Sequence, residues 1–205
     1  MTNGRAMRVT FENVPAFPVV LDHPFELPEY GTVHADVVFG GQFFVQAKAT
    51  DLGVELMPNA AKELARAGAV LRTVAAETFA VSHPLNPDIN RIALVLLCGP
   101  SPTPGVSARN TNVMPAGTVD LDDPATWIGT LDRSPCGTGT SARMAALHAR
   151  GELAIGEDFV HESIIGTTFT GRLRGETRVG DRSAVLPSIS GRGWVTGFNQ
   201  YVLDD

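Results

Sequence analysis

The chain has few of the features that mark whole classes of proteins. Only two of its 205 residues are cysteines, so a disulfide framework is not expected, and reduced thiols in a cytoplasm are the simpler interpretation. The sixteen Lys and Arg residues are scattered and the net charge is −6, which argues against a nucleic-acid partner. No apolar run approaches the roughly 20 residues of a membrane helix, and no signal-peptide pattern opens the chain. We therefore expect a cytoplasmic protein with no membrane partner.

The spacing of the histidines argues against a metal site. The five histidines show neither the H-x-x-x-H nor the H-E-x-x-H spacing that places two imidazoles on one helix face. We therefore predict no metal site, and we interpret His161 as a structural residue.

One passage has a composition that favours chemistry. In LDRSPCGTGTSARMAAL, residues 131–147, Cys136 lies in a glycine-rich turn that leads directly into a helical pattern. Gly137 and Gly139 allow backbone N–H groups to converge, and a helix N-terminus stabilises anions, which predicts a lowered pKa for the Cys136 thiol. The same turn could hold a substrate carboxylate or oxyanion. The N–H groups expected to do so are those of Thr138, Gly139 and Thr140.

Most free cysteines are nonetheless inert small hydrophobes. Cys98 ends the apolar run IALVLLC, residues 92–98, and fits that description. Cys136 has polar and glycine neighbours instead, so we expect it to be the functional thiol.

These motifs carry a resemblance to a known family. DRSPCGTGTSARMA, followed by GEDFVHESIIGTTFTGRL, resembles the second cysteine motif of the proline racemase and hydroxyproline 2-epimerase family. Three further passages are similar to the same family: VTFENVPAFPVVLD (9–22), VVFGGQFF (37–44) and WVTGFNQYVLD (194–204).

The resemblance implies a cofactor-independent inversion at the α-carbon of a small substrate, proline or hydroxyproline. Two cysteines act on opposite faces of the ring, one as thiolate base and the other as thiol acid. The family motif implies that Cys136 is one of these cysteines, that Gly137, Thr138 and Gly139 form an anion cradle, and that Asp132 contacts the ring nitrogen. Ser134 and Thr140 are weaker candidates, because such residues beside a turn are more often caps or local hydrogen-bond donors. Gln42 stands where the family pattern leads us to expect a substrate-facing Asn.

The chain departs from the family in one respect. The family's first cysteine, in a Cys-Gly-His-Gly passage, does not occur here, so we expect a chain truncated at its N-terminus. Three interpretations remain: an amino-acid isomerase, a 3-hydroxyproline dehydratase relative, or a non-catalytic remnant that binds a small carboxylate at the turn or needs a separate first lobe. Dehydratase relatives commonly replace the second cysteine by Thr, so Cys136 argues against the lyase.

The fold implied by the resemblance is α+β and diaminopimelate epimerase-like: a curled, mostly antiparallel sheet wrapped around a central helix. We expect the second lobe to be nearly complete and the first lobe largely absent. The expected division is a crossing strand over 1–20, the second lobe over 21–190 and a return strand over 191–205. Unpaired strand edges predict self-association or a homodimer.

Apolar periodicity and turn residues predict the elements. The expected strands cover 7–14, 17–22, 31–39, 41–49, 78–83, 90–98 and 193–203, with paired strands over 155–177 that bend at Gly166 and Gly171. A helix is expected from Asn59, as its cap, to Glu77. Trp127 is expected to anchor the loop over 120–127 in the core.

Overall fold

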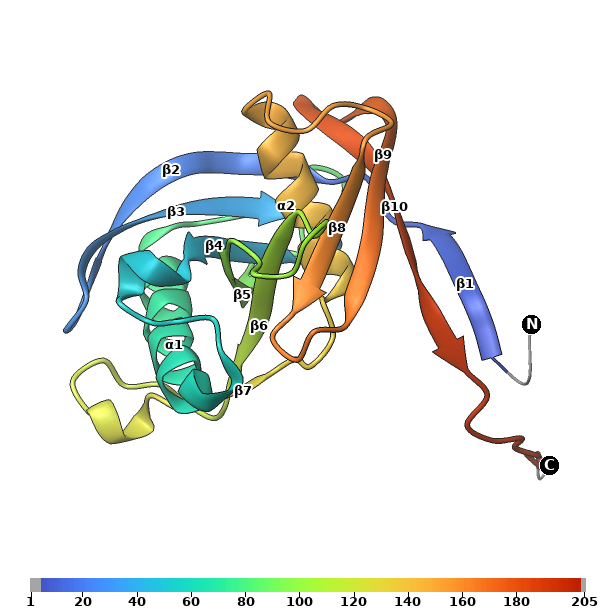
Figure 1. Cartoon of the computed structure of the whole chain (residues 1–205). Helices are drawn as coiled ribbons and strands as arrows, with labels where there is room; N and C mark the ends of the chain where they lie inside the picture. The colour runs from blue at the N-terminus through green and yellow to red at the C-terminus, as the bar shows by residue number, and fades with distance from the viewer. Residues whose placement is uncertain (1–4, 204–205) are drawn as a thin grey trace.

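The computed structural model describes residues 5–203, which form one large sheet and two α-helices (Figure 1). The helices are α1 (Ala61–Thr78) and α2 (Gly137–Ala149). The strands are β1 (Arg5–Glu12), β2 (Phe17–Leu27), β3 (Gly31–Phe39), β4 (Phe43–Lys48), β5 (Ile92–Gly99), β6 (Ala108–Pro115), β7 (Gly129–Leu131), β8 (Asp158–Ser163), β9 (Thr168–Val179) and β10 (Arg182–Trp194). Short 3-10 turns cover Ala49–Leu52, Pro58–Ala60 and Pro124–Thr126.

The sheet curls almost into a closed barrel. Its strand order is β1-β10-β9-β8-β6-β5-β4-β3-β2, with β7 added beside β6. The β4–β5 and β6–β8 pairs are parallel and the other pairs are antiparallel. Ala16, just before β2, forms an antiparallel bridge with Val185 of β10, so the two ends of the sheet meet. The expected curled, mostly antiparallel sheet is therefore confirmed.

Helix α2 lies inside this curl, as Figure 1 shows. Its small side chains allow the sheet to pack closely on every side, and Ala142, Met144 and Ala146 are fully buried. At Gly171 in β9, a Cβ atom would lie 2.5 Å from the sulfur of Met144. Glycine is needed there because the strand passes directly over the helix, whereas Gly166 makes the expected bend with a positive φ of 84°.

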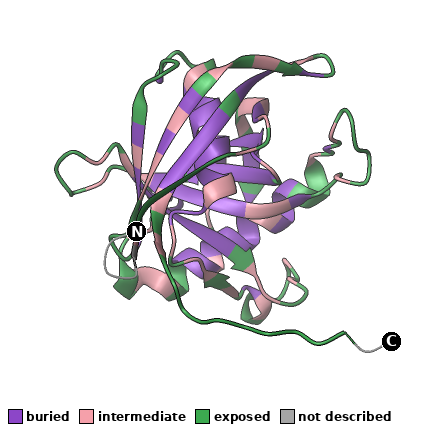
Figure 2. Ribbon diagram, turned by 90° about the vertical axis from the view of Figure 1, so that its right-hand side faces the viewer, coloured by how far each residue is buried: buried purple, intermediate pink, exposed green. Residues whose placement is uncertain are grey.

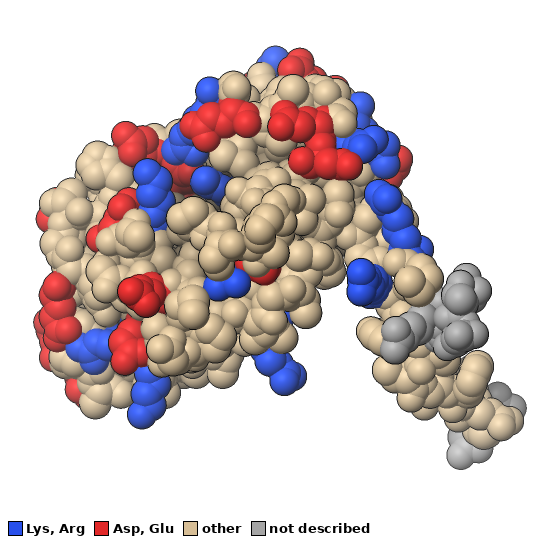
Figure 3. Space-filling model, in the orientation of Figure 1, with Lys and Arg blue, Asp and Glu red and all other residues tan. Residues whose placement is uncertain are grey.

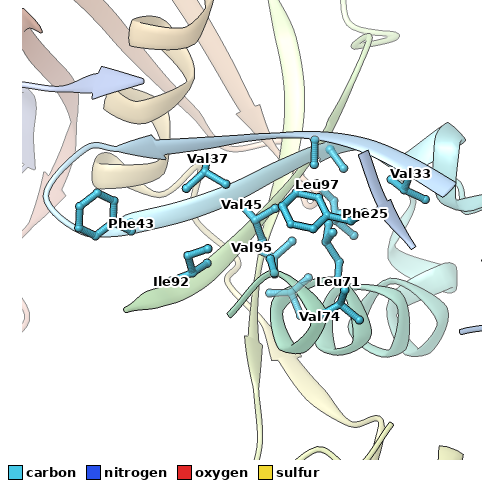
Figure 4. Close-up of a cluster of buried hydrophobic side chains, with 14 of the residues drawn as sticks. Phe25, Val33, Val37, Phe43, Val45, Leu71, Val74, Ile92, Val95 and Leu97 are labelled. Atoms are coloured by element: carbon cyan, nitrogen blue, oxygen red, sulfur yellow. The ribbon is translucent and has the colours of Figure 1, made fainter. Parts of the chain in front are cut away.

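Helix α1 covers the outer face of the sheet. Leu71 and Val74 point from the helix toward Val45, Val95 and Leu97 of the sheet (Figure 4). The apolar side chains of α1 thus form a hydrophobic core with this face of the sheet. Burial of such side chains stabilises the fold by about 1.5–3 kcal/mol each.

The start of α1 differs from the prediction. Asn59 was expected to cap the helix, but it lies within the 3-10 turn Pro58–Ala60, and the N-cap is Ala60 without a side-chain hydrogen bond. Pro58 fixes the backbone of that turn, which leads straight into the helix.

The strand predicted over 78–83 is wrong. Thr78 is the last residue of α1, where its hydroxyl donates to the Val74 carbonyl at 2.7 Å. The following segment contains only an isolated bridge between His83 and Asn86. Trp127, in contrast, is buried as expected, and its indole N–H donates to the Asp120 carbonyl at 2.7 Å.

A two-stranded ribbon extends away from the body of the molecule (Figure 1). It is made by β1 and the end of β10, paired from Glu12 with Ser188 to Arg5 with Trp194. The strand predicted over 193–203 is wrong beyond Trp194, where β10 ends. Residues 195–203 have no regular secondary structure and are exposed (Figure 2). Residue 204, at the end of the family-like passage, lies outside the described residues.

Charged side chains of both signs are interspersed over the face seen in Figure 3, while the ribbon is mostly uncharged on that face. Within residues 5–203, no helix is long and apolar enough to cross a membrane.

Candidate active site at the start of helix α2

Cys136 is the N-cap residue of α2. Its backbone has a positive φ of 61°, a conformation that costs a non-glycine residue on the order of 1 kcal/mol and is found disproportionately at functional sites. This backbone turns the side chain back over the helix start. The Gly139 N–H donates to Sγ at 3.3 Å, and the Thr138 hydroxyl lies 3.6 Å from the same sulfur.

The environment of the thiol differs from the sequence expectation. Burial raises the pKa of Cys136 above its ordinary value, and this outweighs the opposite effect of the hydrogen bonds from Thr138 and Gly139. The nearby charge of Asp132 also raises this pKa. The prediction of a lowered pKa is therefore wrong, because the residue is only 8% exposed and the loss of hydration outweighs the hydrogen bonds to the sulfur. The thiol form predominates at neutral pH.

The predicted anion cradle faces the cysteine itself. Backbone hydrogen bonds from Thr138 and Gly139 act on the sulfur, and Gly137 begins the helix beside them. The Thr140 N–H donates to the Cys136 carbonyl at 2.8 Å. The N–H groups of Thr138 and Gly139 are thus placed where they stabilise negative charge on Sγ. The expected contribution of the Thr140 N–H is wrong, because this group is hydrogen-bonded to the Cys136 carbonyl.

Asp132 and Ser134 hold the turn that precedes the cysteine. The Asp132 carboxylate accepts hydrogen bonds from the Ser134 N–H at 2.8 Å and from its hydroxyl at 3.0 Å. The Ser134 oxygen in turn accepts from the Cys136 N–H at 3.2 Å. Ser134 therefore has the local hydrogen-bonding role that its position beside a turn indicates. Asp132 is brought to the same turn as Cys136.

The turn between β3 and β4 packs directly on the first turn of α2. A Cβ atom at Gly40 would collide with the Thr138 carbonyl oxygen and lie 2.5 Å from the Ala142 nitrogen. At Gly41 it would lie 2.8 Å from the Thr138 methyl group. Only glycine allows this approach. Gln42, the next residue, lines a separate surface hollow with Asp88 and Arg91.

The N-terminal segment contributes two residues that sequence reasoning missed. The Asn13 amide donates to the Gly40 carbonyl at 3.2 Å and to the Ser141 hydroxyl at 2.9 Å, which fastens the end of β1 to α2. The ring of Phe11 lies 3.5 Å from where a Cβ of Gly137 would be, and Phe11 is 49% exposed. Both residues belong to the VTFENVP passage, which was the available signal.

His161 contacts the turn around Cys136 through Thr140. Its Nδ1 lies 2.9 Å from the Thr140 hydroxyl, which donates to the Pro135 carbonyl at 3.1 Å. A hydroxyl has one proton, so Nδ1 is assigned as the donor to Thr140. Complete burial, with the charge of Arg143 as a second cause, lowers the pKa of His161 to about 3. The imidazole is therefore neutral, and it positions Thr140 and the Pro135 turn.

A site for a metal ion was not expected from the sequence. Among residues 5–203, no group of three or more His, Cys, Asp or Glu side chains could hold one.

Solved structures share this architecture. A probable proline racemase from Agrobacterium radiobacter K84, with bound carbonate, matches with a TM-score of 0.85 and 34% identity, over 100% of this chain and 56% of that chain. A hydroxyproline epimerase from Agrobacterium vitis, with bound trans-4-hydroxy-L-proline, matches with a TM-score of 0.82 and 37% identity, over 93% and 51%. The fold is therefore of the epimerase-like α+β class.

Sequence comparisons specify the family. The family model described as proline racemase matches residues 1–205, and the chain belongs to this family. It is 40% identical over 205 residues to a proline racemase of Clostridioides difficile, covering 100% of this chain and 58% of that protein. It is 41% identical over 202 residues to a 4-hydroxyproline 2-epimerase of Streptosporangium roseum, covering 98% and 57%. The chain thus spans less than two thirds of the length of these relatives.

Proposed function

We propose that this chain supplies one acid/base cysteine of an amino-acid isomerase that inverts the α-carbon of proline or hydroxyproline without a cofactor. The observation that carries this proposal is the placement of Cys136 at the start of an enclosed helix, with backbone N–H groups directed at its sulfur. The hydroxyproline bound in the Agrobacterium vitis relative supports the substrate class.

In the proposed reaction, the Cys136 thiolate removes the α-proton. The Cα–H bond breaks as an S–H bond forms, and the electron pair left on the α-carbon is delocalised into the substrate carboxylate. The Gly139 N–H, 3.3 Å from Sγ, lowers the cost of the thiolate that must precede this step. In the reverse direction the Cys136 thiol donates its proton to the α-carbon from the same face.

Inversion also needs an acid/base group on the opposite face of the ring. Cys98 does not fit this role, because it is buried and its thiol donates to the Ala47 carbonyl at 3.4 Å. We therefore propose that the full reaction requires a second group that the cysteines of this chain do not supply.

For Asp132 we propose contact with the ring nitrogen of the substrate. Each carboxylate oxygen accepts one hydrogen bond from Ser134 and retains further acceptor capacity. A secondary ammonium group could therefore donate to Asp132 without breaking the turn.

A second candidate function is binding of a small carboxylate without turnover. The raised pKa of Cys136 favours it, because the thiolate is scarce at neutral pH. The carbonate bound in the Agrobacterium radiobacter relative is a ligand of the same size and charge class.

Self-association, predicted from the sequence, also remains a proposal. Its support is the row of exposed apolar side chains Met7, Val9 and Phe11 on β1, the edge strand of the sheet. Sedimentation equilibrium of the purified chain tests it, and a monomer at all concentrations would contradict it.

Proton NMR in D₂O tests the catalytic proposal. We expect loss of the α-proton signal of proline or trans-4-hydroxy-L-proline with the native chain and with Cys98→Ala, the matched thiol control. Exchange should be absent with Cys136→Ala. Broadening of the ligand signals that depends on an intact α2 turn, without any loss of the α-proton signal, would instead support carboxylate binding alone.

A further inference from the structure

A chain of hydrogen bonds runs from the N-terminal segment to the first peptide unit of α2. The Asn13 side-chain amide donates to the Ser141 hydroxyl oxygen at 2.9 Å, and that hydroxyl donates to the Gly137 carbonyl at 2.9 Å. Ser141 is fully buried, so water does not compete for these bonds. Asn13, Ser141 and the Gly137 carbonyl form what we call the relay.

The direction of the relay follows from the other contacts of Asn13. Its Oδ1 accepts from the Val14 N–H at 2.9 Å, and its Nδ2 donates to the Gly40 carbonyl at 3.2 Å. A carbonyl oxygen can only accept, so the amide nitrogen must face Gly40 and Ser141. The Ser141 oxygen therefore accepts from Asn13, and the single hydroxyl proton is directed to the Gly137 carbonyl.

The far end of the relay lies at the sulfur of Cys136. The Gly137 carbonyl and the Thr138 N–H are the two ends of one planar peptide unit. This N–H acts on the sulfur together with the Gly139 N–H, whose nitrogen is 3.3 Å from Sγ. A hydrogen bond accepted by the carbonyl fixes the plane of the peptide unit and polarises it, which strengthens the bond that its N–H donates.

A hydroxyl in a helix often donates to the carbonyl four residues earlier without any functional consequence. Thr73 of α1 is such a case, because it is buried and donates to the Ala69 carbonyl at 2.9 Å. Ser141 differs from it in two respects. Its oxygen accepts a hydrogen bond from a residue 128 positions away, and its carbonyl partner belongs to the turn that holds the sulfur. Thr73 therefore serves as the matched control.

We propose that Asn13 and Ser141 are positioning residues for Cys136, which orient and polarise the first peptide unit of α2 so that its N–H stabilises the thiolate. The inference rests on the acid/base function proposed for Cys136 and deepens it. A buried thiol that acts as a base needs fixed dipoles directed at its negative charge, because water cannot solvate it there. The relay connects that requirement to a segment distant in the sequence.

The ionisation of Cys136 gives a readout that needs no substrate. In the full chain carrying Cys98→Ala, Cys136 is the only thiol, and the ¹³Cβ chemical shift of labelled cysteine follows its titration. Ser141→Ala should lower the ratio of thiolate to thiol at a given pH by about two- to fourfold. Asn13→Leu, at a half-buried position, should lower it by less, because Ser141 then still donates to Gly137.

Thr73→Ala should leave the ratio of thiolate to thiol unchanged, even where it lowers the unfolding free energy as much as Ser141→Ala does. Asp132, whose charge also acts on the thiol, is kept in every variant. Equal titrations with and without Ser141→Ala would overturn the proposal and leave the relay as a fastening of β1 to α2. If Ser141→Ala does not fold, an unchanged titration of Asn13→Leu would overturn it equally. Because the titration needs no turnover, this failure is distinct from failure of the proposed function, which would appear as absent α-proton exchange.

Discussion

Replacing His161 by glutamine is expected to reduce the sensitivity of the fold to mild acid. The imidazole is completely buried and its pKa is lowered to about 3, from an ordinary value of 6.5. Because the folded state resists protonation, the contribution of neutral His161 is complete above pH 6.5 and is lost as the pH falls toward 3.

The magnitude follows from the size of this shift. One pKa unit corresponds to about 1.36 kcal/mol, so the whole shift from 6.5 to about 3 is worth on the order of 4–5 kcal/mol. At pH 5 the native chain should already have lost about 2 kcal/mol of unfolding free energy relative to pH 8. The lowered carboxyl pKa values of Asp158 and Glu162 act only in more acidic solution.

Urea denaturation at a series of pH values between 8 and 5 provides the assay. His161→Gln will itself change stability through its contact with Thr140, but that change is the same at each pH. The unfolding free energy of the native chain, relative to that of the variant, should therefore fall by about 2 kcal/mol between pH 8 and pH 5. Parallel curves would refute the burial and neutrality assigned to His161.

Two further predictions concern the helix start. The rate of α-proton exchange by the native chain should keep rising with pH beyond 9.0, the ordinary pKa of a cysteine, because burial raises the pKa of Cys136; an exchange rate already constant below pH 8 would contradict this. Gly40→Ala should lower the unfolding free energy by about 1–3 kcal/mol or more through overpacking against Thr138. Gly175→Ala, where a new Cβ meets nothing within 4 Å, is the matched control, and equal losses in a urea titration of both variants would count against the close approach of the β3–β4 turn.

The parts of the site that sequence reasoning predicted are local ones. The turn around Cys136 and the helix after it follow from glycine and small-residue spacing within one segment. Ser134 likewise acts on its immediate neighbours, as a residue beside a turn is expected to.

The parts that it missed depend on distant segments. Asn13 reaches Ser141 across 128 positions, and His161 meets Thr140 across 21, contacts that no local pattern encodes. The direction of the Cys136 pKa shift failed for the same reason, since the cost of burial is set by the sheet that encloses α2. The fold class was predicted from the family-like motifs. The end of β10 at Trp194 was not predicted, because the alternation of apolar and polar residues does not mark it.

The most direct test of the central claim, that Cys136 is an acid/base group acting on one face of the substrate, is α-proton exchange measured separately for L- and D-proline in D₂O. The account predicts exchange of one enantiomer far faster than the other with the native chain, and none of either with Cys136→Ala. Exchange that persists in Cys136→Ala, or that is equal for the two enantiomers, would contradict it.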